Sequence, residues 1–422
     1  MGRQLSHHES SHAMGYVPEA GRYRWVVFGM FVACNTSGFL IANTIGILLP
    51  AISQDIGISP MEQGMLSSAP FWANLTLMVV VSWWTSRYPP KILVTVTMIL
   101  GALSLFFQGW GPAFVWLMLG RLAFGVTMIA REPARSLLIR QWLPQREVNI
   151  AGGVSNLFFG VIVSGGLLLT PVLLRVYGGD WRPVMNTFGV IFIALGVAWV
   201  LLGKERESEV AQSEAKVGVV ESNAEGSIVK RAFGFREVWV AGLGFTGALM
   251  SFASFNSFLP TLALESYGIS LGGSGLIAAL YVLPGGFSGI LVGYLLKGTE
   301  GRAPVLAIAG LVIAASFAGM TLTDSYPILL GLAVANGLAW GFFPILYMVP
   351  FHLAGIRPRE IAVAVAVVMS MASLGSSVGP TLTGYLQETQ GSLQVALRII
   401  SLSPLTLVVA GGLLRSENQN KV

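Results

Sequence analysis

Three arginines and one glutamate interrupt an apolar run between residues 113 and 139: Arg121, Arg131, Glu132 and Arg135. On a helix turning about 100° per residue they fall within an arc of about 100°, so they share one face. Charges inside a membrane are costly, which predicts that this face points into a helix bundle or a water-filled cavity. Arginine grips carboxylates and oxyanions through paired hydrogen bonds, so three positive charges against one negative favour an anionic ligand.

These four charges have separate expected roles. We expect Arg131 and Arg121 to bind substrate and Arg135 to act in gating. Glu132 is the one acid deep in an apolar run, so it is the candidate proton carrier. Alternatively, Glu132 and Arg135 neutralise each other across one turn, and Arg135 extends to the membrane surface. A permanent salt bridge at Glu132 would favour uniport or exchange.

Uncharged polar and aromatic side chains on other apolar runs could complete such a site. The expected ligands are Asn43 in the first run, Asn256 in the seventh, and Asn336, Trp340 and Tyr347 in the tenth. The last three follow helical spacing and form one stripe with an arc of about 60°. Alternatively, the asparagines join helices to one another and the aromatic stripe is packing.

The composition indicates which elements position these residues. Charged residues are 11% of the 422 residues, against about 25% in ordinary globular chains. Apolar residues reach 54% and mean hydropathy is +0.71. The apolar runs are too long for barrel strands and do not alternate, so we predict an all-α integral membrane protein. Its twelve transmembrane helices are predicted at residues 25–50, 62–84, 92–110, 113–139, 149–174, 183–203, 238–263, 271–296, 303–323, 327–352, 360–385 and 394–414.

Lysine and arginine are distributed unevenly between the two sides of these helices. With both termini inside, the inner segments hold nineteen of them and the outer loops hold only Arg175 and Arg182. Positive charge stays on the cytoplasmic side. We therefore expect a multi-pass protein of the plasma or inner membrane, with both termini cytoplasmic.

A short signature occurs twice in the chain. Leu49-Pro50, Gly57-Ile58-Ser59 and Gly64 return as Leu259-Pro260, Gly268-Ile269-Ser270 and Gly275, the glycines at an offset of 211 residues. Internal duplication in a hydrophobic chain is typical of two-halved carriers. The predicted divisions are a cytoplasmic disordered tail (1–23), a six-helix bundle (24–203), a cytoplasmic linker (204–236), a second six-helix bundle (237–415) and a cytoplasmic tail (416–422).

Several motifs follow one another in a familiar order. They are Arg121-x-x-x-Gly125 with Pro133, a glycine-rich fifth helix with Pro171, Gly179-Asp180-Trp181-Arg182, and Gly379-Pro380 with Gly384. Over about residues 23–415 the chain resembles the major facilitator superfamily, most closely its cyanate-permease-like and organic-anion symporter branches. The resemblance implies two six-helix pseudo-repeats in the major facilitator fold. It also implies gating roles for Pro171, Pro380, Arg87 and Lys91, although Ser86 replaces the acid that is usual in the loop of Arg87.

These observations together predict a secondary active transporter and no enzyme. It would move a small anionic solute, carboxylate- or cyanate-like, by alternating access with proton coupling; the alternative is a proton-coupled exporter of drugs or amphiphilic metabolites. The chain has no Gly-x-x-x-x-Gly-Lys-Ser/Thr loop for ATP, and its single cysteine, Cys34, excludes a cysteine-based metal site. We expect no cofactor, metal or nucleic acid. The expected partners are the substrate, protons and the lipid bilayer, and the expected state is a monomer.

Overall fold

The computed structural model describes the backbone of residues 21–85, 87–144, 147–204, 231, 233–295, 302–353 and 355–419. Most of the predicted N-terminal tail (1–23) and of the predicted linker (204–236) lies outside the described residues, as do residues 420–422 of the predicted C-terminal tail. All regular structure in the described part of the chain is helical, which confirms the all-α fold class. Ten helices there are long and apolar enough to cross a membrane.

The first half of the chain forms six membrane-length segments. The helices are α1 (Tyr23–Ile56), α2 (Pro60–Thr85), α3 (Pro90–Trp110), α4 (Phe114–Ala130), α5 (Glu132–Trp142), α6 (Val148–Val176) and α7 (Trp181–Leu202). Among these, α4 and α5 follow one another as a single interrupted span.

The second half repeats this order. The helices are α10 (Arg236–Tyr267), α11 (Leu271–Leu295), α12 (Arg302–Met320), α13 (Tyr326–Ala339), η2 (Trp340–Phe342), α14 (Phe343–Tyr347), η3 (Val349–His352), α15 (Pro358–Gln390), α16 (Leu393–Ile400), η4 (Ser403–Leu405) and α17 (Thr406–Gln419). The segments from α13 to η3 form the tenth span, and those from α16 to α17 form the twelfth.

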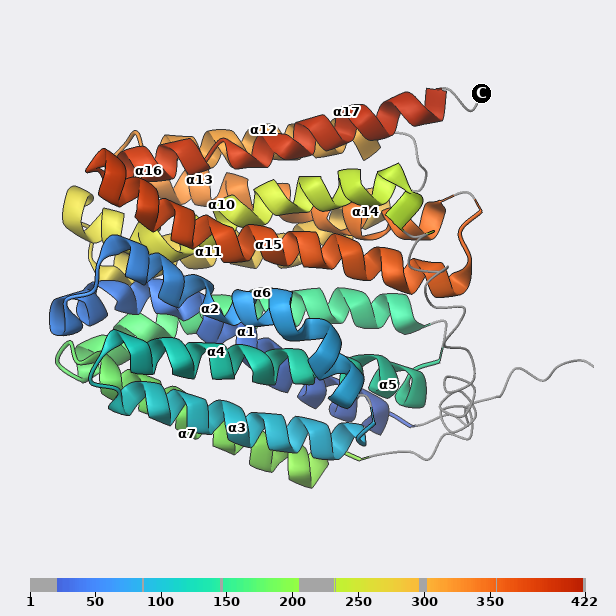
Figure 1. Ribbon diagram of the computed structural model, residues 1–422, viewed down its shortest axis with the longest axis horizontal. Coiled ribbons are helices and arrows are strands. Elements are labelled where there is room, and N and C mark those ends of the chain that lie inside the picture. Colours follow the sequence, from blue (N-terminus) through green and yellow to red (C-terminus); the bar gives the residue numbers. More distant parts are fainter. Residues whose placement is uncertain are drawn as a thin grey trace, which may run out of the picture.

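The two halves lie side by side with their helices roughly parallel, the first from blue to green and the second from yellow to red (Figure 1). The end where α1 joins α2 is called here the α1–α2 end, and the opposite one the α2–α3 end. Helices α2 and α6 of the first half pack against α15 and α11 of the second, and α1 packs against α10. These helices form the boundary between the halves.

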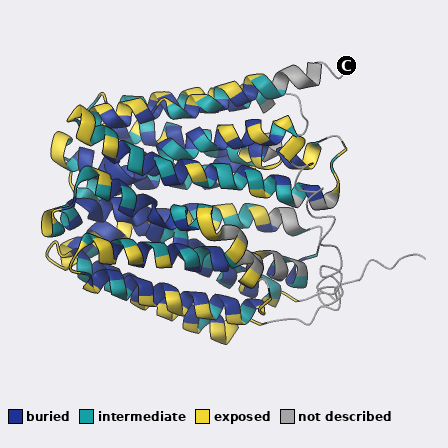
Figure 2. Ribbon diagram, viewed as in Figure 1, coloured by how far each residue is buried: buried dark blue, intermediate teal, exposed yellow. Residues whose placement is uncertain are grey.

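Burial follows the position of each helix in the bundle. Exposed residues gather on the outer sides of the two halves, whereas α1 and α10 at the boundary are mostly buried (Figure 2). Many exposed residues are large and apolar, such as Leu103 on α3, Val115 on α4 and Leu311 on α12. A continuous apolar outer surface of this kind matches hydrocarbon rather than water.

The fourth, tenth and twelfth spans are interrupted, where the sequence predicted continuous helices. In the twelfth, a 3-10 turn over Ser403–Leu405 separates α16 from α17. In the fourth, α4 ends at Ala130 and α5 begins at Glu132, with Pro133 in its first turn. In the tenth, a 3-10 turn over Trp340–Phe342 precedes Pro344. Proline has no N–H to donate and its ring clashes with the carbonyl four residues earlier, which favours a break just before it. The helices α2, α6 and α15 nevertheless continue through Pro70, Pro171 and Pro380. Pro133 and Pro344 are 211 residues apart, so the break is itself part of the repeat.

Candidate functional site

Glycines of the repeated signature end two helices and bring the two halves together. Gly57 and Gly268 adopt left-handed conformations (φ 69° and 65°) that close α1 and α10. Further along, a β-carbon at Gly64 would overlap the carbonyl oxygen of Pro380, and one at Gly275 would lie 2.7 Å from the carbonyl oxygen of Leu167. The repeat therefore encodes two equivalent close contacts, α2 with α15 and α11 with α6.

A third close contact joins α1 to α10. A β-carbon at Gly46 would overlap the carbonyl oxygen of Asn256 and would lie 2.8 Å from that of Ser257. Gly46 and Ser257 are 211 residues apart, so this contact lies on the pseudo-twofold axis of the repeat. The close contacts at Gly46, Gly64 and Gly275 are called here the glycine seam.

Hydrogen bonds between the halves lie at the same level as the seam. Asn256 Nδ2 donates to the Asn43 carbonyl at 2.7 Å, and Ser164 Oγ to the Ala279 carbonyl at 3.1 Å. The hydroxyls of Ser68 and Thr381 lie 2.9 Å apart, and the Met61 N–H donates to Glu388 at 2.9 Å. All four lie in the half of the bundle nearer the α1–α2 end, so the described conformation is closed there.

Two prolines expected to act in gating lie at this seam. The carbonyl of Pro380 faces Gly64, and the ring of Pro171 lies 3.2 Å from the β-carbon position of Gly275. Pro171 also lacks the N–H that would bond the Leu167 carbonyl within α6. Their gating role stays a prediction.

The two predicted asparagine ligands, Asn43 and Asn256, are brought together at the boundary. Besides donating to the Asn43 carbonyl, Asn256 accepts a hydrogen bond from the buried Tyr281 hydroxyl at 3.1 Å. The Asn43 side chain donates to the Phe39 carbonyl within α1 at 2.7 Å. In this conformation both amides bind protein atoms.

The predicted stripe on the tenth span is divided by the helix break. Trp340 Nε1 donates to Asn336 Oδ1 at 3.2 Å, and Asn336 Nδ2 donates to Ser316 Oγ at 2.8 Å. Tyr347, which is 38% exposed, stacks on Phe343 instead, with ring centroids 6.4 Å apart. The prediction of a single stripe assumed uniform α-helical spacing, which the 3-10 turn over Trp340–Phe342 does not keep.

Arg121 is fully buried and binds the main chain of two other helices. Its Nε donates to the Leu66 carbonyl of α2 at 3.0 Å, and its terminal nitrogens reach the carbonyls of Ile41 and Ala42 in α1 at 3.4 Å. The Leu66 carbonyl is available because Pro70, four residues later, has no N–H. Arg121 thus fastens α4 to α1 and α2.

Arg131 is also fully buried but lies among different helices. Its Nη1 donates to the Cys34 carbonyl of α1 at 2.7 Å and lies 2.9 Å from Met98 Sδ of α3. Its guanidinium carbon is 5.9 Å from the centre of the Phe192 ring of α7. Arg131 therefore sits inside the first half, about two turns along α1 from the carbonyls that Arg121 reaches.

A cleft of about 180 Å³ opens between α1, α6 and α7 beside Arg131. Phe192 and Ser37 line it, and Ser37 adjoins Gly38, whose β-carbon position lies 2.8 Å from Arg131 Nη2. The remaining lining residues are apolar or glycine.

The other predicted charged residues lie toward the α2–α3 end. Arg135 is exposed on α5, and the side chain of Glu132 lies outside the described residues. Arg87 is exposed in the loop before α3, while Lys91 in the first turn of α3 is half-buried and its carbonyl accepts from Trp199 Nε1 at 3.1 Å.

Two ion pairs at the α2–α3 end were not anticipated from the sequence. Arg24 at the start of α1 lies 2.8 Å from Glu147 before α6, and Arg231 before α10 lies 3.2 Å from Glu360 in α15. Glu147 and Glu360 belong to Arg-Glu pairs that recur with the repeat. That recurrence marked the two glutamates in the sequence, but it did not indicate that Arg24 and Arg231 are their partners.

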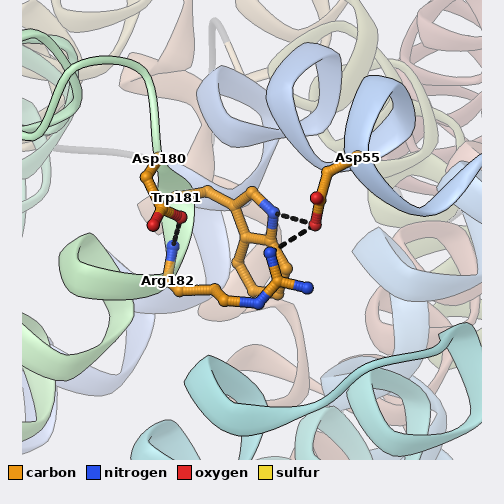
Figure 3. Close-up of polar contacts among 4 residues, drawn as sticks. All are labelled: Asp55, Asp180, Trp181 and Arg182. Carbon is orange, nitrogen blue, oxygen red and sulfur yellow. Dashed lines mark hydrogen bonds and ion pairs between the residues drawn. The ribbon is translucent and has the colours of Figure 1, made fainter.

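A third cluster ties α1 to α7 at the α1–α2 end. Asp55 accepts hydrogen bonds from Trp181 Nε1, at 3.1 Å, and from the Arg182 guanidinium, which also packs on the Trp181 ring (Figure 3). Asp180 caps α7 by accepting from the Arg182 N–H at 2.9 Å. The Gly-Asp-Trp-Arg motif thus fixes the end of α1 within its own half.

Two sets of six membrane-length helices that are related by a repeat and meet at a closed seam define a two-halved membrane carrier. Residues 26–380 match the Major Facilitator Superfamily, and the chain belongs to that family.

Known proteins with similar sequences or folds are transporters. The chain is 26% identical to the "Uncharacterized transporter YybO" of Bacillus subtilis (strain 168), over 91% of this chain and 92% of that protein. It is 25% identical to the "Probable L-galactonate transporter" of Escherichia coli (strain K12), over 86% and 82%. A solved bacterial homologue of the human lysosomal transporter Spinster shares the fold, with a TM-score of 0.73, 18% identity and coverage of 93% and 96%.

Proposed function

We propose that this protein is a secondary transporter that carries a small anionic solute, carboxylate- or cyanate-like, across the cell membrane by alternating access with proton coupling. Its membership of a transporter family and a relative named for the anion L-galactonate both support this proposal. The observation that carries it is the buried positive charge of the first half.

The second half of the repeat shows that the fold itself does not need this charge. At an offset of 211 residues, Arg121 corresponds to Leu332 and Arg131 to Phe342. The Cys34 position, which Arg131 contacts, corresponds to Phe245, and the Phe245 and Phe342 rings are likewise in contact at 5.9 Å. One architecture thus accepts either an aromatic pair or a buried arginine at the same place.

A buried guanidinium is costly within a membrane, so keeping one where the repeat accepts phenylalanine favours a functional role. Charge acts more strongly in low-dielectric surroundings than in water, so Arg131 can attract an anion in the bundle without being exposed. Arg121 lies on the boundary side of α4 and adds to the same potential. Asn43, Asn256, Asn336 and Trp340 are the proposed polar groups near the substrate path.

In alternating access, the conformation that is closed at the α1–α2 end would be open at the α2–α3 end, and a second conformation would be open at the α1–α2 end instead. The excess of lysine and arginine in the predicted inner segments supports a cytoplasmic α2–α3 end. Arg87, Lys91, Arg135 and Tyr347 lie toward that end and are the proposed gating or entry residues. Rocking of the two halves about the glycine seam is the motion that the repeat favours.

The first test concerns Arg131. We expect small carboxylates or cyanate- and nitrate-like anions to raise the melting temperature of the purified protein at fixed ionic strength, and Arg131→Gln to abolish the rise. A ligand at 100 times its dissociation constant stabilises by about 2.7 kcal/mol, which such a scan resolves. Arg175→Gln removes an exposed arginine at the end of α6 and serves as the matched control.

An unchanged anion response in Arg131→Gln would remove Arg131 from the proposal. Stabilisation by lipophilic cations alone would overturn anion transport and favour the exporter.

The second test concerns proton coupling at Glu132. In proteoliposomes, we expect Glu132→Gln to abolish substrate-driven proton movement, read by an internal pH dye, while substrate exchange continues. Glutamine keeps the size of glutamate but cannot release a proton. Glu265→Gln, at an exposed position near the end of α10, should leave coupling intact. Proton movement that persists in Glu132→Gln would show that another group carries the proton.

A further inference from the structure

Aromatic rings gather near the midpoints of the helices that meet between the two halves. On the first half, the Phe39 ring of α1 meets the Phe159 ring of α6 edge-on, with centroids 5.6 Å apart. On the second half, the Phe252 ring of α10 meets Tyr281 of α11 at 5.9 Å and Trp340 of the tenth span at 5.1 Å, both nearly perpendicular.

These two ring groups belong to one region of the molecule. Helix α1 packs against α10 and α6 against α11, so the ring pair of the first half lies on the helices that pack against those of Phe252 and Tyr281. Trp340 lies behind them on η2, which packs against α11. Both groups pack against a single core cluster that draws residues from the two halves. Phe39, Phe159, Phe252 and Trp340 are each only half-buried, so part of every ring remains uncovered in this conformation.

The polar groups beside the rings are bound to other protein atoms. Asn256 uses both ends of its amide, donating to the Asn43 carbonyl and accepting from Tyr281. Asn336 accepts from Trp340 and donates to Ser316. A ligand with many hydroxyl groups would have to break these hydrogen bonds and replace them, whereas an apolar body would leave them in place.

We propose that the carried anion has an aromatic or otherwise apolar body and a single small charged group, unlike a polyhydroxylated sugar acid. The inference rests on the proposed function, because it takes anion transport as given and specifies the rest of the substrate. The arginines of the first half supply attraction for the charge, and the half-buried rings accept the body edge-on or stacked. This departs from the relative named for L-galactonate, whose solute carries several hydroxyls.

The deciding experiment is equilibrium binding to the full-length protein in detergent. Benzoate and phenylacetate are compared with galactonate and glucarate at equal pH and ionic strength, with a lipophilic cation in parallel. We expect the aromatic carboxylates to bind about tenfold more tightly than the sugar acids, since one ring contact of this kind is worth up to about tenfold in affinity. Phe252→Leu should weaken aromatic carboxylates by a similar factor and leave other anions unchanged.

Phe107→Leu is the matched control, because it removes a ring from the Phe107–Trp116 pair at the edge of the first half. Equal or tighter binding of sugar acids would overturn the inference while leaving anion transport standing. Equal weakening of all anions by Phe252→Leu would also overturn it. Binding of the cation without any anion would overturn the proposed function itself. The wild-type comparison decides between these outcomes even where a variant fails to fold.

Discussion

Gly46→Leu forces the two halves apart at the α1–α2 end and stops transport. A β-carbon at position 46 already overlaps the carbonyl oxygen of Asn256, which is main chain and cannot rotate away. The closed conformation described here is therefore excluded, and the population shifts to one that is open at this end. Gly46→Ala should act in the same direction with a smaller effect.

Labelling of a cysteine at the seam measures this opening. Ser257→Cys lies beside Gly46, and the native Cys34 is buried, so background labelling is low. We expect a membrane-impermeant maleimide to react much faster with Ser257→Cys when Gly46 is leucine. Gly29→Leu is the control on the same helix, because nothing lies within 4 Å of its β-carbon position. Equal labelling and transport in the two leucine variants would contradict the close contact at Gly46.

Arg121→Gln lowers the free energy of unfolding by about 3 kcal/mol, because it removes the 3.0 Å hydrogen bond to the Leu66 carbonyl and a hydrogen bond from a charged donor contributes about 1.5–3 kcal/mol. The Leu66, Ile41 and Ala42 carbonyls then lose a shared donor inside the bundle. Chemical denaturation in detergent, followed by circular dichroism, measures the loss.

A second substitution tests whether the free Leu66 carbonyl explains this loss of stability. Pro70→Ala restores an N–H that can bond the Leu66 carbonyl within α2. In a protein that carries Pro70→Ala, Arg121→Gln should therefore lower the free energy of unfolding by less. Exposed Arg175→Gln should change stability little. If Arg121→Gln lowers the free energy of unfolding equally with and without Pro70, then the stabilising role of Arg121 does not depend on the Leu66 carbonyl that the proline leaves free.

Hydropathy located the helices well. The second span, predicted at 62–84, is the helix Pro60–Thr85, and the third, predicted at 92–110, is Pro90–Trp110. Long apolar runs need only local sequence to be recognised, and the glycines that end α1 and α10 are local signals too. The fourth, tenth and twelfth spans were wrongly predicted as unbroken, because long apolar runs do not show where a helix is interrupted.

Contacts between segments that are distant in the chain were harder to predict from the sequence. Arg121 and Arg131 were assigned to one face by counting residues along a straight helix. In the structure Arg121 reaches α1 and α2, whereas Arg131, at the break, reaches α1, α3 and α7. The repeat marked Gly64 and Gly275 as special, but their partners Pro380 and Leu167 come from far along the chain. Tyr281, which donates to Asn256, likewise lies on a different helix.

The glycine seam also bears on the speed of the transport cycle. It is built mostly from main-chain carbonyls against glycine residues, and such contacts are each worth about 0.5–1 kcal/mol. Its four described hydrogen bonds between halves contribute about 1 kcal/mol each. A closure of this strength can be broken and re-formed on every turnover by the binding energy of one small solute, whereas interlocking side chains would slow each opening.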